Sequence, residues 1–140
     1  MKLLKFFSLM LVAAGMLLVT SCRKDDTPKA MNADDVNPAH LLGRWQNDKD
    51  NGWYKRYTNT EAPSVLDGSY ELGRDWNVGE GINEFSEGTE FYWKLEGNVI
   101  REQYPTMSIF LPRVYTLMTL TSSKLEYFDQ YNEILSFTKQ

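Results

Sequence analysis

The chain has 140 residues, a formal net charge of −4, one cysteine and one histidine. This length predicts one domain, and the acidic charge disfavours nucleic acid as a partner, because nucleic acids are bound by basic patches. A zinc site needs three or four ligands and cannot be assembled from one cysteine and one histidine, so neither a metal nor another cofactor is expected.

The N-terminus has the pattern of a secretion signal. Lys2 and Lys5 precede an apolar run over residues 6–19 that is broken by one serine and one glycine. A membrane-spanning helix needs about 20 apolar residues, so this shorter run predicts a removable signal peptide, residues 1–21. Its removal takes away two lysines and no acid, which leaves a charge of −6.

The signal ends in the stretch LVTSC, and Cys22 is its last residue. An aliphatic residue, two small residues and a cysteine resemble the lipoprotein box of bacteria. This resemblance implies that Cys22 is acylated and begins the mature chain. Several acyl chains anchor a protein stably, whereas one binds only reversibly. The alternative is a plain secreted protein with a free thiol.

The charged run RKDD at 23–26 resembles the export signal of Bacteroidota lipoproteins. This implies a lipid-anchored outer-membrane protein that is exposed at the cell surface, although such a run can also simply keep a linker solvated. Residues 22–36 are predicted to be a flexible tether, because the stretch 23–40 contains almost no large apolar side chain. It would hold the folded part roughly 20–25 Å from the anchor.

Residues 37–140 form the predicted domain. Asn37 suits an N-cap and Pro38 a first helical position, so a short helical turn should precede Gly43. Alternation of apolar and polar residues, with Gly and Asn between the segments, then predicts strands. They cover 43–48, 52–59, 67–76, 82–86, 89–96, 98–103, 113–121, 124–129 and 133–139.

The expected fold is all-β, an antiparallel up-and-down barrel of eight or nine strands, with a sandwich as the alternative. The apolar residues of the stretch 108–121 fall on both faces, so this strand should be buried on both sides or bulged. With no disulfide available, the core must be hydrophobic, and the many aromatic residues suffice for it.

Gly43 and Trp45, directly after the helical turn, resemble the first strand of lipocalins, in which the tryptophan closes one end of the barrel. The stretches FYWKLEGNVI, YTLMTLTSSKLEY and ILSFTK look like the short lipocalin-like domains of Bacteroidota lipoproteins. In lipocalins an arginine near the last strand packs on the tryptophan. No arginine follows Arg113 here, and Lys139 is the late cation that could take its place.

The barrel is expected to bind a small apolar or amphipathic ligand, because aromatic side chains can line an apolar pocket. Lys55 and Arg56 could orient an anionic head group or could point outward. The alternative is a filled barrel that contacts glycan or a partner protein through exposed aromatics. The candidate ligand-binding residues are Trp53, Tyr57, Trp93 and Phe137.

Catalysis is not expected. His40 is the single histidine, so it is the one histidine that could act as the base for a nucleophile. Acid pairs formed by Glu84, Glu87 and Glu90 could serve glycoside chemistry. Their setting in a glycine-rich acidic stretch instead indicates a solvated face.

Overall fold

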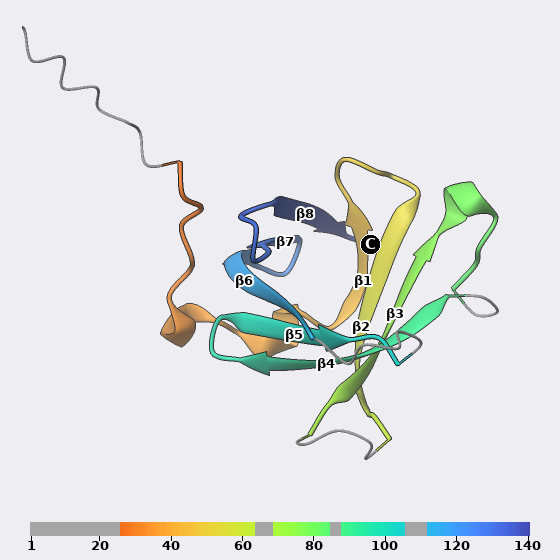
Figure 1. Ribbon diagram of the computed structural model, residues 1–140, viewed down its shortest axis with the longest axis horizontal. Helices are drawn as coiled ribbons and strands as arrows, with labels where there is room; N and C mark the ends of the chain where they lie inside the picture. The colour runs from red at the N-terminus through yellow and green to blue at the C-terminus, as the bar shows by residue number, and fades with distance from the viewer. Residues whose placement is uncertain (1–25, 64–68, 85–87, 106–111) are drawn as a thin grey trace, which may run out of the picture.

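A computed structural model of the protein describes residues 26–63, 69–84, 88–105 and 112–140. Eight strands form a closed antiparallel barrel in which chain neighbours are sheet neighbours (Figure 1). The prediction of an all-β up-and-down barrel is therefore confirmed. The strands are β1 (Gly43–Asn47), β2 (Trp53–Glu61), β3 (Glu71–Asn77), β4 (Thr89–Glu96), β5 (Val99–Gln103), β6 (Arg113–Leu120), β7 (Lys124–Phe128) and β8 (Ile134–Lys139).

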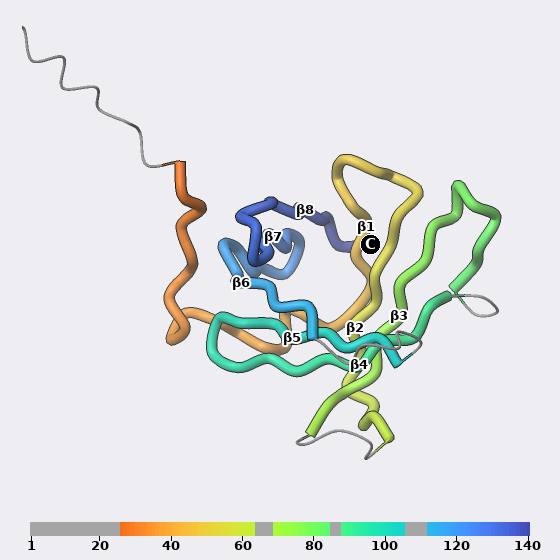
Figure 2. The backbone as a smooth tube through the Cα atoms, viewed as in Figure 1, coloured from red at the N-terminus to blue at the C-terminus, as the bar shows by residue number. Residues whose placement is uncertain are grey.

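The barrel closes because β1 pairs with both β2 and β8. Trp45 lies opposite Lys55 on one side and opposite Lys139 on the other. The tube in Figure 2 follows this path from the first strand to the last. Successive side chains of a strand point to opposite faces, so Lys55 and Tyr57 point into the barrel and Arg56 points outward.

The predicted strand at 82–86 is wrong for the residues that the structure describes. Residues 82–84 follow the short 3₁₀ helix η3 (Val78–Glu80) and are not in a strand. Asn77 caps η3 by accepting a hydrogen bond from the Gly79 N–H at 2.8 Å, and Gly81 ends it with φ of 77°. Because this capped turn uses the left-handed conformation that glycine adopts freely, the alternating pattern does not extend into a strand.

The irregular strand predicted near residue 113 is β6. Its pairing with β7 shifts register between Leu117 and Thr119. Leu117 and Leu120 are both buried, although three positions apart they would face opposite sides of a regular strand. The shift therefore explains why apolar residues occupy both sequence faces.

The two ends of the barrel differ. At the N-terminal end, where β1 begins, the 3₁₀ helix η2 (Pro38–His40) is capped by Asn37, whose side chain accepts a hydrogen bond from the Ala39 N–H at 3.1 Å. The predicted helical turn is thus present. At the distal end lie the β1–β2 turn, η3, the beginning of β6 and the β7–β8 turn.

Part of the predicted tether lies on the barrel. The Met31 N–H donates to the Leu117 carbonyl at 2.8 Å, and the Asn98 side chain donates to the Met31 carbonyl at 2.8 Å. Met31 and Val36 also pack against the core, and η1 (Ala33–Asp35) lies between them. Residues 31–36 are therefore docked, because these two apolar side chains have a surface to bury. Cys22 and residues 1–21 lie outside the described residues.

Gly73 leaves room for the ring of Phe91 across the β3–β4 pair. A Cβ at this position would lie 2.3 Å from two atoms of that ring. We expect Gly73→Ala to lower the free energy of unfolding by about 1–3 kcal/mol, because overpacking forces the neighbours to shift. Urea unfolding measures this loss. In a Gly73→Ala/Phe91→Leu double variant the two losses should not add, and strict additivity would contradict the steric explanation.

Asp48 connects the end of β1 to β7 and β8. It accepts hydrogen bonds from Ser136 at 2.6 Å, from Thr138 at 2.7 Å and from Lys124. Slight burial raises the pKa of this carboxyl, but the three hydrogen bonds together lower it by a larger amount. The pKa therefore lies below its ordinary value of 3.8. The ionised form is therefore the one that the folded state favours.

This shift predicts a pH dependence of stability. A lowered folded-state pKa stabilises the protein above the unfolded-state pKa, and the contribution is lost as the pH falls through the folded-state value. We expect Asp48→Asn to be less stable than the unchanged protein at neutral pH, and the difference to shrink below about pH 4. Urea unfolding between pH 7 and pH 3 measures it. A difference that stayed constant over this range would contradict the linkage.

Candidate functional site

The N-terminal end brings Gly43, Trp45 and Lys139 together. The Trp45 indole is fully buried and donates to the Leu41 carbonyl at 2.7 Å. The Lys139 ammonium lies 4.9 Å from the centre of the indole ring and donates to the His40 carbonyl at 2.9 Å. Burial lowers the pKa of Lys139. Its position over the ring is the one that the resemblance to lipocalins implied for a late cation.

Gly43 is needed beside this lysine. Its φ is 121°, a conformation that L side chains rarely adopt, and a Cβ would lie 2.9 Å from the Lys139 side chain. These three residues therefore lie in contact at the N-terminal end of the barrel.

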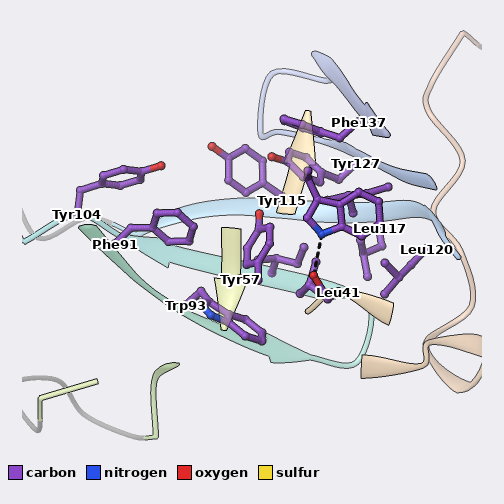
Figure 3. Close-up of a cluster of buried hydrophobic side chains, with 13 residues drawn as sticks. Leu41, Tyr57, Phe91, Trp93, Tyr104, Tyr115, Leu117, Leu120, Tyr127 and Phe137 are labelled. Atoms are coloured by element: carbon purple, nitrogen blue, oxygen red, sulfur yellow. Dashed lines mark hydrogen bonds between the residues drawn. The ribbon is translucent and has the colours of Figure 1, made fainter. Parts of the chain in front are cut away.

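The four predicted ligand-binding rings form two packed pairs inside the barrel. The ring centres of Tyr57 and Trp93 are 5.4 Å apart at 87°, and those of Trp53 and Phe137 are 5.4 Å apart at 69°. Such edge-to-face contacts are favourable for aromatic side chains. Figure 3 shows the rings of Tyr57, Trp93 and Phe137 among the buried side chains. These rings are used by the core, and none of the four lines either of the two surface hollows described below.

A buried ion pair lies among these rings. The Lys55 ammonium donates to one oxygen of Glu102 at 2.6 Å, and the Tyr57 hydroxyl donates to the other at 2.5 Å. Both charged side chains are fully buried. The ammonium also lies 5.1 Å from the ring centre of Tyr115 and 5.4 Å from that of Phe91, so aromatic faces surround the cation.

The surroundings set the protonation of this cluster. Burial by itself lowers the pKa of Lys55, but Glu102 and the nearby tyrosines together raise it by a larger amount. The pKa therefore lies well above its ordinary value. Burial and the Glu102 charge both raise the pKa of Tyr57. Lys55 is therefore cationic and Tyr57 neutral at physiological pH, which suits a structural role better than proton transfer.

Hydrogen bonds extend from this cluster toward the distal end. The Tyr104 hydroxyl donates to Asp75 at 2.8 Å and lies 3.4 Å from Glu102, while the Trp53 indole donates to the other Asp75 oxygen at 2.7 Å. Burial is the main cause that raises the pKa of Tyr104. A continuous chain of hydrogen bonds therefore runs from Lys55 and Glu102 to Asp75 and Trp53, toward the distal end of the barrel. Both carboxylates have partners in it.

Sequence reasoning missed Glu102 and left the direction of Lys55 open. Trp53, Lys55 and Tyr57 are alternate residues of β2, and alternate residues of a strand share one face. This spacing could have predicted that Lys55 points into the barrel. Glu102 is 47 residues away from Lys55, and no local pattern relates the two. Arg56 points outward instead, where it pairs with Glu84 at 2.7 Å.

The acid pairs considered for glycoside chemistry, Glu84 with Glu87 and Glu87 with Glu90, both include Glu87, which lies outside the described residues. Glu90 lies 3.7 Å from Arg74 on the outer wall. In the described ranges, no group of three or more His, Cys, Asp or Glu side chains could hold a metal ion, and no helix is long and apolar enough to cross a membrane.

Among the described residues, two surface hollows are candidate sites. One, of about 210 Å³, is on the outer wall of β2 and β3 and is lined by Arg56, Arg74 and their carboxylate partners. The other, of about 430 Å³, is at the distal end between the beginning of β6 and the β7–β8 turn. We call the second one the distal hollow. Its lining includes Arg113, Tyr115, Asp129, Gln130 and Tyr131.

Comparison of the chain with protein-family models, with curated proteins and with solved structures finds no match.

Proposed function

We propose that the protein is a lipid-anchored, non-enzymatic binding module of the bacterial outer membrane, exposed at the cell surface. Its barrel is a packed structural core, and its distal end faces away from the membrane and meets the target. The packing of Trp53 against Phe137 and of Tyr57 against Trp93 supports a filled barrel. The lipoprotein-like sequence around Cys22 supports the anchor.

The docked segment that begins at Met31 is the observation that carries the orientation. The hydrogen bond from the Met31 N–H to Leu117 and the one from the Asn98 side chain to the Met31 carbonyl fix the chain beside the β4–β5 turn, at the N-terminal end of the barrel. In Figure 1 the chain leaves the barrel on this side, opposite the β3–β4 connection. Eight residues lie between Cys22 and Met31, so nine steps of the chain join the two, a span of about 15–18 Å for a flexible chain. An anchor on Cys22 would therefore hold the N-terminal end near the bilayer.

Energy transfer to a lipid dye tests this orientation. Acylation consumes the thiol of Cys22, so a single new cysteine can be labelled in the lipidated protein. We compare Ser122→Cys, in the β6–β7 turn at the N-terminal end, with Gln130→Cys in the β7–β8 turn at the distal end. In vesicles with acceptor-labelled lipid, the donor on residue 122 should transfer more energy. Equal or reversed efficiencies would contradict the proposed orientation.

The anchor itself is tested by acylation. The full chain expressed in a lipoprotein-competent host should incorporate radiolabelled palmitate, and Cys22→Ala should not. If the unchanged chain takes up no label, the anchor is wrong. If Cys22→Ala stays with the membrane fraction, another surface holds the protein there.

The competing function is a small apolar or amphipathic ligand inside the barrel. The aromatic rings around the Lys55 cation favour it, because such a lining can hold an amphipathic molecule with an anionic group. Glu102 already neutralises this cation, so an occupant would have to displace packed rings or the carboxylate. Mass spectrometry of an organic extract of the gently purified protein separates the two functions. A stoichiometric small molecule would favour the barrel ligand, and an empty extract favours the filled barrel.

A further inference from the structure

The β7–β8 turn holds one large aromatic ring in solvent. Tyr131 is 80% exposed, the largest value among the exposed large hydrophobic residues of the described ranges. The Asp129 side chain accepts hydrogen bonds from the Tyr131 N–H at 2.8 Å and from the Glu133 N–H at 2.9 Å. Asn132 completes the turn with φ of 63°. The ring is thus attached to a turn that these hydrogen bonds hold, and most of it is in contact with solvent.

Arg113 also lines the distal hollow, and its guanidinium is hydrogen-bonded to Tyr115. The centre of the Arg113 guanidinium lies 4.6 Å from the centre of the Tyr104 ring, a stacking contact that orients it. Within the described part of the chain, no acidic side chain lies within ion-pair distance of Arg113. A guanidinium held in this way can pair with a ligand carboxylate through two parallel hydrogen bonds.

The hollow between these two groups offers further polar groups. Asp129 and Gln130 line it, and the carboxylate and the amide can bind hydroxyl groups. Its volume of about 430 Å³ is within the range of small-molecule sites. A ligand for the whole site needs an apolar ring face, several hydroxyls and one anionic group. A sugar ring that carries a carboxylate combines all three.

We infer that the distal hollow binds an acidic saccharide of the uronic-acid type. Tyr131 packs against the C–H face of a sugar ring, Arg113 takes the carboxylate, and Asp129 and Gln130 bind hydroxyls. This inference deepens the proposed surface-binding role and rests on it. It also accounts for a cation at this position in a protein whose mature chain carries a net charge of −6.

Calorimetric titration of the full-length protein in detergent micelles tests the site. The probes are a trigalacturonate and its neutral counterpart, a galactotriose. We expect the acidic trimer to bind at least tenfold more tightly at low salt, because only a carboxylate offers Arg113 an opposite charge and two parallel hydrogen bonds. Tyr131→Ala should weaken binding by about tenfold. Arg113→Gln should remove the preference for the acidic trimer.

Matched variants give the controls. Arg101→Gln removes another half-exposed arginine, which pairs with Glu96 on the outer wall at 2.6 Å, and should leave binding unchanged. No binding of either trimer, or binding that Arg113→Gln and Tyr131→Ala leave intact, would overturn the site. If glutarate competed as well as the uronate trimer, the hollow would bind any carboxylate and the saccharide assignment would be wrong. Energy transfer that still oriented the distal end outward would then leave the anchored binding module standing.

Discussion

Lys55→Met is expected to lower the free energy of unfolding by about 3–5 kcal/mol, since it leaves the Glu102 carboxylate buried without its cation. The hydroxyl of Tyr57 would remain as a hydrogen-bond donor to Glu102, but it cannot neutralise the charge. Burial of an unpaired carboxylate is far more costly than the loss of one hydrogen bond. Urea unfolding monitored by tryptophan fluorescence measures the change.

The double variant Lys55→Met/Glu102→Leu separates the cost of an unpaired charge from the value of the pair. Well-packed apolar replacements for a buried ion pair are often neutral or stabilising, so the double variant should recover most or all of the lost stability. Lys94→Met is the surface control. Lys94 pairs with Glu96 on the outer wall, and its loss should barely change the unfolding midpoint. Additive losses in the double variant would contradict this explanation.

Trp45→Ala is expected to cost about 3–5 kcal/mol, as large buried aromatic residues generally do when they are truncated. The indole is fully buried at the N-terminal end of the barrel and has Lys139 over its face. Its removal would leave a cavity beneath η2 and would take away the donor to the Leu41 carbonyl. Thermal and urea unfolding measure the loss.

Trp45→Phe divides this effect into two parts. It keeps most of the ring but removes the N–H, so the loss should include about 0.5–1.5 kcal/mol for the hydrogen bond. Lys139→Met tests the cation above the ring and should cost less than Trp45→Ala. If Trp45→Ala unfolded at the same urea concentration as the unchanged protein, the closure of this end of the barrel would not depend on the indole.

Together these variants examine both parts of the packed interior. Loss of stability at Lys55 and at Trp45 is expected of a structural core. If a ligand bound inside the barrel, the affinity of the protein for that ligand would also change in these variants. Tyr131 itself is 80% exposed and lies outside this core, so Tyr131→Ala should keep the stability of the unchanged protein.

Several parts of this fold could be predicted from the sequence because their causes are local. Asn37 and Pro38 specify the helical turn through capping and a fixed φ. Alternation along β8 predicts one buried face, and the Gly97-Asn98 pair predicts a tight turn between β4 and β5. In β4 the alternation predicts the buried face but not the burial of Tyr92 on the opposite face, where it packs with Tyr70. Enough such strands in succession favour a closed barrel, since closure removes the unpaired edges.

Other features depended on contacts between distant parts of the chain. Period two assigned Lys55 to the same face as Trp53 and Tyr57, but whether that face holds a charge depends on Glu102 from β5. The docking of Met31 depends on the Leu117 carbonyl in β6 and on the Asn98 side chain in the β4–β5 turn. Neither partner leaves a signal near the residue that it contacts.

The sequence by itself therefore determined the class of fold, the strand order and the signs of a lipid anchor, because capping, alternation and the thiol after an apolar run are properties of neighbouring residues. The tertiary structure alone decided that the four candidate rings pack in pairs, that a buried ion pair occupies the barrel, and that Arg113 and Tyr131 face one hollow. These depend on which strands become neighbours when the sheet closes, and closure brings together residues whose separation along the chain carries no record of their contact.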